Sequence, residues 1–358
     1  MKTNRRALLF LLINISLIAP TPLAQQKYFY KERDYGSDAV YNPLNLILNG
    51  SYDIIQLDKK SREIFSLPYK DGFNNVLKNL SSPFRVIKET GWKDFVSNEL
   101  FPITLTKKGA QWWPNYQLHL IGGGMTYRAT AEWYEAHGVP QPKLFSFATM
   151  AFYHLLNEAV ENGSFAGYNA DPVADIYFFD LGGIILFSYD NVCRFFSEEL
   201  NLADWSLQPS FTFNPVRLQN NGQYFSIKWK LPFSEKVHLF YYFGMNGLGG
   251  LSYKFNDSSY ISIGAGLRAK NLETLDEKYF KNTIKKTWNA GVFYDINNSL
   301  MTSIFFSGLT SYKVNLNIYP GIFKIGSLSP GLWIVLQDKG KLLFGITAAW
   351  LPGFGFVP

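Results

Sequence analysis

Histidine and acidic residues recur at helical spacing in the middle of the chain, where they could bind a metal ion. His154, Glu158 and Glu161 stand at positions i, i+4 and i+7, so a helix would carry all three on one side. His119 lies on an earlier, mostly apolar segment. Imidazole and carboxylate groups on adjoining helices hold divalent metal ions in helix bundles. These four residues are the candidate metal ligands, and no other cofactor is expected.

Acids of the same region have two further interpretations. Glu158, Asp171 and Asp175 are candidate catalytic residues, because paired carboxylates can act as general acid and base. In a structural interpretation, Asp171 instead caps a helix, and Glu158, Glu161 and His154 bond to backbone groups or to Arg128. The spacing matches neither the Glu-x-x-His of di-iron bundles nor the His-Glu-x-x-His of zinc proteases. The sequence therefore leaves metal binding, catalysis and a structural role open.

Three predicted helices would position these side chains. They cover Gln117–Glu135, Phe145–Glu161 and a segment from Asp171 to about Phe187. Asp171 and Pro172 fit a helix cap followed by proline at the first helical position. The apolar face of the second helix is predicted to consist of Phe145, Ala148, Phe152, Leu155, Leu156 and Ala159.

The first residues are predicted to be a secretion signal. Lys2, Arg5 and Arg6 form a positive start, and the apolar run Ala7–Ile18 follows it. The run is too short to span a bilayer comfortably, and small residues lead to an exit at Ala24. We therefore expect an exported protein.

Segments of the C-terminal half alternate apolar and polar side chains. Along Tyr260–Lys270, apolar residues such as Ile261 and Ile263 alternate with small polar positions such as Ser262 and Gly264. This period of two predicts β-strands. Several of the segments have about ten residues, the length that a tilted strand needs to cross a bilayer.

Composition favours a membrane barrel over a soluble β-sandwich, which is the alternative. Aromatic residues make up 17% of the chain, yet the mean hydropathy is only −0.07. Transmembrane β-strands combine these properties because one face is apolar and the other polar. The predicted fold class is α+β, with an N-terminal helical periplasmic domain followed by a C-terminal antiparallel transmembrane β-barrel of about 8–12 strands, its interior nearly filled by side chains.

Asparagine, aspartate and glycine residues mark the connections between these strands. An exposed, charged loop is predicted at Asn271–Lys286. Turns are predicted at Asn220–Gly222, Asn256–Ser258, Asn297–Asn298 and Asp338–Gly340.

Charge and cysteine content exclude some classes of protein. The formal charge of +6 would fall to +3 without Lys2, Arg5 and Arg6, which is too little for a nucleic-acid-binding surface. Cys193 is the single cysteine, so no internal disulfide can form, and it is expected to be buried filler. The expected partners are outer-membrane lipid, the barrel assembly machinery, and an envelope protein or cell-wall material.

The helical region resembles a known group of sequences. Uncharacterised bacterial envelope proteins, in which a helical segment precedes an outer-membrane barrel, have similar motifs. The resemblance implies an envelope location and no established activity, so it assigns no residue a role. The motifs in this chain are His119, Gly122 with Gly123, Asn157 with Glu158 and Glu161, Asp171 with Pro172 and Asp175, and Gly182 with Gly183.

Four regions follow from these patterns, and they set the expected function. The expectation is an outer-membrane barrel with a periplasmic helical domain and a structural or binding role. The alternative is an envelope enzyme or metal-binding protein that uses the helical histidines and acids. The regions are a signal peptide at 1–24, a mixed N-terminal periplasmic segment at 25–108, a helical domain at 109–205 and the β-barrel at 206–358.

Overall fold

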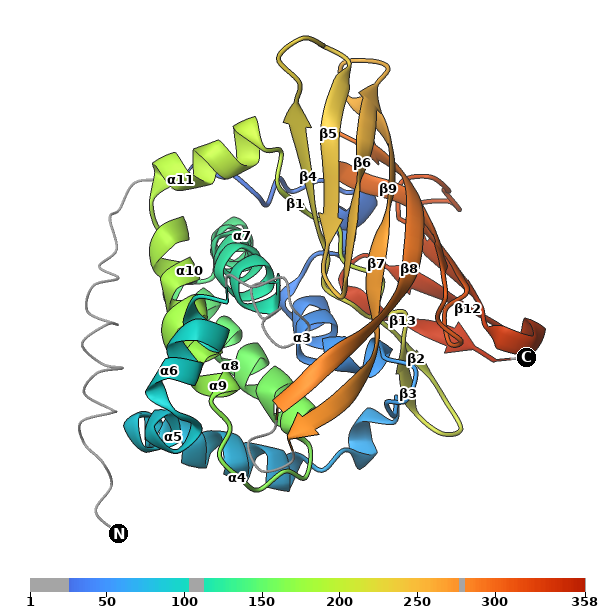
Figure 1. The fold of residues 1–358 in the computed structure, drawn as a ribbon. Helices are drawn as coiled ribbons and strands as arrows, with labels where there is room; N and C mark the ends of the chain where they lie inside the picture. Colours follow the sequence, from blue (N-terminus) through green and yellow to red (C-terminus); the bar gives the residue numbers. More distant parts are fainter. Residues whose placement is uncertain (1–25, 103–112, 277–280, 358) are drawn as a thin grey trace.

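The chain has an α+β fold, in which a helical N-terminal half packs beside a large β-sheet. The computed structural model describes residues 26–102, 113–276 and 281–357. Figure 1 shows the helices gathered on one side of the strands. The strands form one 13-stranded sheet that is almost entirely antiparallel. The predicted signal peptide lies outside the described residues.

The helical half consists mostly of short helices joined by tight turns. Four stretches of the described chain, η3, η4, η5 and η6, have π-helical hydrogen bonding, which is rare and often marks functional sites. The α-helices are α2 (Gly36–Val40), α3 (Pro43–Ser51), α4 (Tyr69–Leu80), α5 (Pro83–Thr90), α6 (Trp92–Asp94), α7 (Gly124–Ala136), α8 (Pro142–Asn162), α9 (Asp171–Ala174), α10 (Leu181–Phe187) and α11 (Asp190–Arg194). The other turns are η1 (Asp53–Gln56), η2 (Ile64–Ser66), η3 (Phe95–Leu100), η4 (Trp113–Gly123), η5 (Asp175–Asp180) and η6 (Phe195–Glu199).

Among the described residues, no single helix has the length and apolar character of a membrane span. The segments Asp171–Phe187 and Asp190–Glu199 meet that test only together, and they are bent by 87°.

The predicted apolar face of helix α8 is buried only in its C-terminal part. The extent of the helix agrees with the prediction, and Leu156 and Ala159 are buried, but Phe145 and Phe152 are exposed. His154 and Glu158, from the predicted polar side, are also buried and are 5% and 3% exposed. A helix normally buries its apolar stripe alone. The C-terminal part of α8 is therefore buried on its polar side as well.

The strands run through the C-terminal half in a simple up-and-down order. Consecutive strands from β4 to β13 are hydrogen-bonded neighbours. The turns predicted around residues 257, 298 and 339 do join such neighbours. The strands are β1 (Ala203–Asp204), β2 (Ser210–Thr212), β3 (Arg217–Gln219), β4 (Phe225–Lys230), β5 (Val237–Phe243), β6 (Asn246–Lys254), β7 (Ser259–Asp276), β8 (Lys281–Ile296), β9 (Ser299–Ser307), β10 (Val314–Ile318), β11 (Gly331–Leu336), β12 (Leu342–Ala348) and β13 (Leu351–Phe356).

The two ends of the strand order belong to one long hairpin. Strand β1 pairs with β4, and β2 pairs with β3, in a single antiparallel register. Between these pairs, Trp205 donates its backbone N–H to Tyr224, and Leu207 donates to Gly222, in the same register. Residues 203–212 therefore run alongside residues 217–226, and β2 also pairs in parallel with β13. Both strands of this hairpin are interrupted, so they count as β1 to β4. The sheet therefore has 13 strands, which is more than the predicted 8–12.

The turn predicted at Asn220–Gly222 lies inside this hairpin and is a wrong prediction. Asn220 and Asn221 are fully buried. The side chain of Asn220 donates to Gln208 and Asn317, and that of Asn221 donates to the carbonyl of Tyr52. Buried partners thus satisfy the amide groups that would otherwise favour a turn at the surface.

The two faces of the sheet have opposite character. On β7, Ile263 is 60% exposed whereas its neighbour Ser262 is completely buried. The inward side carries a buried aromatic cluster. Members of this cluster include Trp205, Tyr224, Phe240, Tyr242, Phe293, Phe305 and Tyr319. Exposed apolar side chains of the outward side include Leu239, Leu251, Ile261, Ile263, Leu267, Trp288, Val292, Phe306, Ile334, Phe344, Ile346 and Phe354.

The loop predicted at Asn271–Lys286 is largely part of two long strands. Asn271 pairs with Lys285, and Leu272 pairs with Ile284, so β7 and β8 continue past the rest of the sheet. Figure 1 shows this hairpin reaching toward the helices. Leu272 and Ile284 pack against a buried cluster that includes helical residues such as Leu48. Apolar contacts with the helices thus stabilise strands whose charges had suggested a loop.

Candidate functional site

Three helical segments bring histidines and acids together in the buried centre of the helical half. Segment η4 carries His119, α8 carries His154 and Glu158, and η5 carries two aspartates. We call the set His119, His154, Glu158, Asp175 and Asp180 the carboxylate–histidine cluster. It contains two overlapping groups of three residues whose ligand atoms lie within 4.8 Å of one another. One group is His119, His154 and Asp180, and the other is His119, Glu158 and Asp175.

The cluster is organised around Asp180, which the sequence analysis missed. Its Oδ1 lies 2.9 Å from His119 Nδ1, at hydrogen-bond distance, and its Oδ2 lies 3.2 Å from His154 Nδ1. His119 Nε2, on the other side of the ring, lies 3.5 Å from Asp175 Oδ2. Asp175 and Asp180 are five residues apart, the repeat of π-helical hydrogen bonding. The π-helical turn η5 therefore presents both aspartates to the same histidine.

Several polar atoms of the cluster are buried without a hydrogen-bond partner. They include Nε2 of His154 and Oδ1 of Asp175. Both side chains are at least nine-tenths buried. Such atoms are costly because they lose their contacts with water and gain none in return. The two atoms therefore mark positions where a bound group would be stabilising.

The described residues supply little positive charge to balance the acids. Within these residues, no lysine or arginine forms an ion pair with Glu158, Asp175 or Asp180. The arginine considered as a partner, Arg128, pairs instead with Glu132 and Asp190. Its side chain also donates to the carbonyl of Gln26. These ion pairs of Arg128 are therefore with acids outside the cluster.

The two histidines differ in their affinity for protons. Burial lowers the pKa of His119, but attraction and hydrogen bonding by Asp180, with Glu158 and Asp171 adding to it, raise it overall to about 9. Burial lowers the pKa of His154 to about 4, and Asp180 only partly opposes this shift. The charge of His119 lowers the pKa of His154 further. Asp180 contacts both rings, yet a proton on one histidine disfavours a proton on the other.

Burial and mutual repulsion act on the acids. Burial is the largest cause that raises the pKa of Glu158 well above its usual value, and Asp175, Asp171 and Glu161 add to it. Burial likewise raises the pKa of Asp175, with Asp171 the next cause. Glu161 and Asp171 themselves are partly exposed and form the rim of the cluster toward solvent. Such a group of acids can ionise together only if a cation is present.

The sequence-predicted residues converge, with one correction at the rim. His119, His154, Glu158 and Asp175 lie in the cluster, while Glu161 and Asp171 affect its charge from the rim. Asp171 was predicted to cap a helix. The capping position is instead occupied by Ala170, without a side-chain hydrogen bond. The carboxylate of Asp171 therefore remains available to the rim.

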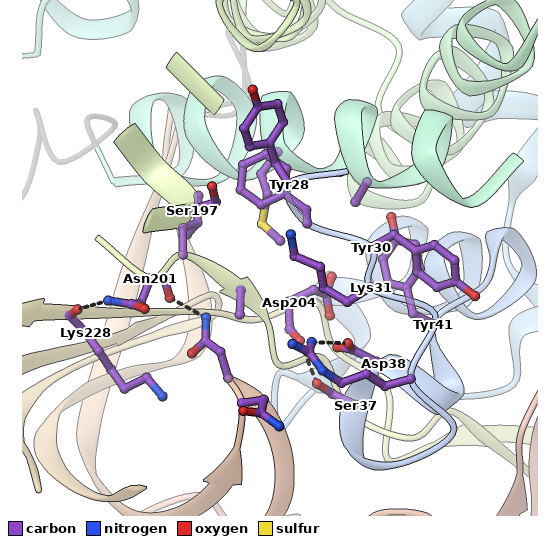
Figure 2. A pocket seen from close by; sticks show the side chains of 18 of the residues that line it. Tyr28, Tyr30, Lys31, Ser37, Asp38, Tyr41, Ser197, Asn201, Asp204 and Lys228 are labelled. Atoms are coloured by element: carbon purple, nitrogen blue, oxygen red, sulfur yellow. Dashed lines mark hydrogen bonds and ion pairs between the residues drawn. The ribbon is translucent and has the colours of Figure 1, made fainter. Parts of the chain in front are cut away.

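A separate cavity lies where the helical half meets the ends of the strands. It has a volume of about 460 Å³ and is lined by none of the cluster residues. Figure 2 shows Tyr28, Tyr30 and Lys31 from the N-terminal segment on one side, and Asn201 and Asp204 on the other. Arg33 and Asp38, which form an ion pair, also line the cavity. Acids and bases of the lining are mixed, so the cavity does not select a ligand of one charge.

Comparisons with known proteins identify no relative. No family model, curated protein or solved structure matches the chain. The resemblance to bacterial envelope proteins therefore stays a prediction, and the argument for function comes from the molecule itself.

Proposed function

We propose that the chain is a β-barrel protein of a bacterial outer membrane whose periplasmic helical half binds a divalent metal ion. The apolar outward face of the strands carries the first part of this proposal. Leu251, Ile263 and Ile346 come from different strands, and each is about half exposed or more. Large contiguous apolar surfaces on a folded chain indicate an interaction with lipid or another apolar partner.

The strand order supports a barrel rather than a sandwich. The strand order begins at β1 and ends at β3, and both strands belong to the hairpin of residues 203–226. The sheet that runs from β4 to β13 therefore has no edge that must stay unpaired. In a soluble sandwich the apolar faces would pack on each other and the polar faces would meet water. Here Ser226, Ser252 and Ser303 are buried on the inward side, while the apolar side chains point outward. This is the inside-out arrangement of membrane barrels.

The metal-binding part rests on the acids of the carboxylate–histidine cluster. Oδ1 of Asp175 is buried without a hydrogen-bond partner, and Glu158 lies beside Asp175 without a lysine or arginine counter-ion among the described residues. A divalent cation would occupy such a site and neutralise the carboxylates. Lipid and the barrel assembly machinery are the proposed partners of the strands. We favour a binding role over an enzymatic one.

Two measurements on the full-length protein test the proposal. Membrane fractionation should recover the protein with the outer membrane, and its gel mobility in detergent should change on boiling. Recovery as a soluble protein would reject the barrel. Elemental analysis of the purified protein should find a stoichiometric divalent metal that Glu158→Gln removes. Wild-type protein that neither contains such a metal nor takes it up would reject the metal site.

A further inference from the structure

We infer that one divalent ion is held by His119 Nε2, Glu158 and Asp175, while Asp180 orients the histidines without binding the ion. The inference rests on the proposed metal-binding role. It decides between the two overlapping groups of the cluster, which share His119.

The two ring nitrogens of His119 determine the choice. They point in different directions, so one ion can bind only one of them. Nδ1 is 2.9 Å from Asp180 Oδ1, and Nε2 faces Asp175 at 3.5 Å. Histidine ligands almost always donate their other N–H to a carboxylate, a carbonyl or a water. With Nδ1–H donated to Asp180, His119 has the lone pair of Nε2 free for the ion.

The remaining donors favour the same position. Beside Nε2 stand Glu158 and Asp175, and Oδ1 of Asp175 is buried and unpartnered. In the other group, both oxygens of Asp180 already lie near a ring nitrogen, Oδ1 at 2.9 Å from His119 Nδ1 and Oδ2 at 3.2 Å from His154 Nδ1. Two carboxylates and one imidazole make three protein ligands. Metal sites with three protein ligands keep further positions for water or a ligand.

The rim of the cluster is more exposed than its centre. Glu161 and Asp171 are partly exposed, whereas Glu158 and Asp175 behind them are buried. A cation could therefore enter past two acids, and water could reach the open positions of the ion from the same side. The donor set combines one nitrogen with carboxylate oxygens, which suits divalent ions such as Zn²⁺, Fe²⁺ or Mn²⁺ and not the soft Cu⁺.

His154 has a supporting role in this arrangement. Its Nδ1 lies 3.2 Å from Asp180 Oδ2, and its ring centroid is 5.2 Å from that of His119. Contact with both residues lets His154 fix the position of the Asp180 carboxylate. His154 is thus a positioning residue that acts through Asp180.

Zn²⁺ titration of the purified full-length protein in detergent tests the assignment. Glu158→Gln and Asp175→Asn should abolish binding of one Zn²⁺ per chain, because each removes a ligand. Asp180→Asn should weaken binding by about 10- to 100-fold, the usual effect of losing the partner of a histidine ligand. His154→Gln should weaken it less than Asp180→Asn. Glu89→Gln, at an exposed site on α5, is the matched control and should bind as wild type.

Cobalt separates ligands from positioning residues. Co²⁺ bound to Asp180→Asn should keep the absorption bands of the wild-type complex, because the donor atoms are unchanged. Each variant should first show wild-type gel mobility and circular dichroism. If Asp175→Asn fails to fold, Glu158→Gln alone decides. Binding lost in Asp180→Asn and His154→Gln but kept in Glu158→Gln would overturn the assignment, as would two ions per chain. Wild-type protein that binds no Zn²⁺, Co²⁺, Fe²⁺ or Mn²⁺ would reject the metal-binding role itself.

Discussion

The side-chain oxygen of Asn49 accepts a hydrogen bond of 2.9 Å from the backbone N–H of Gly222. The Asn49 amide also donates to the carbonyl of Leu207. Leu207 and Gly222 face each other in the long hairpin, where one of their two ladder bonds is direct. The Asn49 side chain replaces the other bond. Helix α3 is therefore joined to the strands by two hydrogen bonds, which need both the donor and the acceptor of the Asn49 amide.

Asn49→Ala should consequently lower the free energy of unfolding by about 1–3 kcal/mol, because it leaves a buried N–H and a buried carbonyl unpaired. Urea unfolding of the detergent-solubilised protein would measure the change. Asn74→Ala, an exposed asparagine on α4, should leave stability nearly unchanged. Equal stability of the two variants would show that water replaces the Asn49 amide.

If the strands form the proposed membrane barrel, Ile263→Arg should impair its assembly. Ile263 is 60% exposed on the outward face of β7, and arginine at the bilayer midplane costs about 2–4 kcal/mol. Ile263→Leu is the matched control and should assemble normally. The measurement is the fraction of protein that reaches the heat-sensitive folded form. In a soluble protein, arginine at an exposed position would be harmless, so normal assembly of Ile263→Arg would contradict the membrane location.

Ser262, next to Ile263, lies on the opposite face of β7. A hydrated polar lumen would tolerate Ser262→Arg, yet Ser262 is completely buried and donates to Ser252 at 2.8 Å. An arginine side chain at this buried position would have to displace its neighbours. Ser262→Arg should therefore also impair folding, and it should do so in detergent micelles as well as in membranes. Folding of this variant with wild-type yield would show that the interior is hydrated and adaptable.

The alternation of strands could be predicted because it depends on local geometry alone. Successive side chains of any strand point to opposite faces, so the exposure of Ile263 and the burial of Ser262 follow from their order. The turn signal at Asn220–Gly222 failed because its meaning depends on the surroundings. The same amides that bond to water at a surface here bond to buried groups such as Asn317.

The site could be predicted only where the spacing was that of an α-helix. His154 and Glu158 are one turn apart and do share a buried side of α8. Asp180 was missed because it is five residues from Asp175, a spacing that shares a face in the π-helical turn η5 but not in an α-helix. The burial of the polar side of α8 could not be predicted from its apolar residues, because Leu156 and Ala159 of the apolar face are buried as well.

Glu132→Ala should release the N-terminal segment. The Glu132 carboxylate accepts backbone N–H groups of Tyr28, Phe29 and Tyr30 and pairs with buried Arg128. Removal of one partner of a buried ion pair costs about 3–5 kcal/mol. Limited proteolysis should cut near residue 30 faster in Glu132→Ala than in wild type or in Glu89→Gln. Unchanged proteolysis would mean that apolar contacts alone hold this segment.

The metal-free protein should lose stability as pH rises through the neutral range. Burial, with repulsion from Asp171, raises the pKa of Glu161 from 4.5 to about 7. The unfolded chain therefore releases this proton at lower pH than the folded chain, so the free energy of unfolding falls between about pH 4.5 and 7. The raised pKa values of Glu158 and Asp175 act in the same direction. His154, with its lowered pKa, acts in the opposite direction at the acidic end.

Comparison of two proteins isolates the contribution of Glu161. Melting temperatures in EDTA, measured between about pH 5 and 8, should fall less steeply for Glu161→Gln than for wild type, because the amide does not ionise. Added Zn²⁺ should reverse the trend in wild type, since a bound cation favours the ionised carboxylates and its affinity rises as they lose protons. Identical profiles for the two proteins in EDTA would show that Glu161 is fully hydrated. Zn²⁺ that gives no stabilisation at the upper end of this pH range would argue against a cation among these acids.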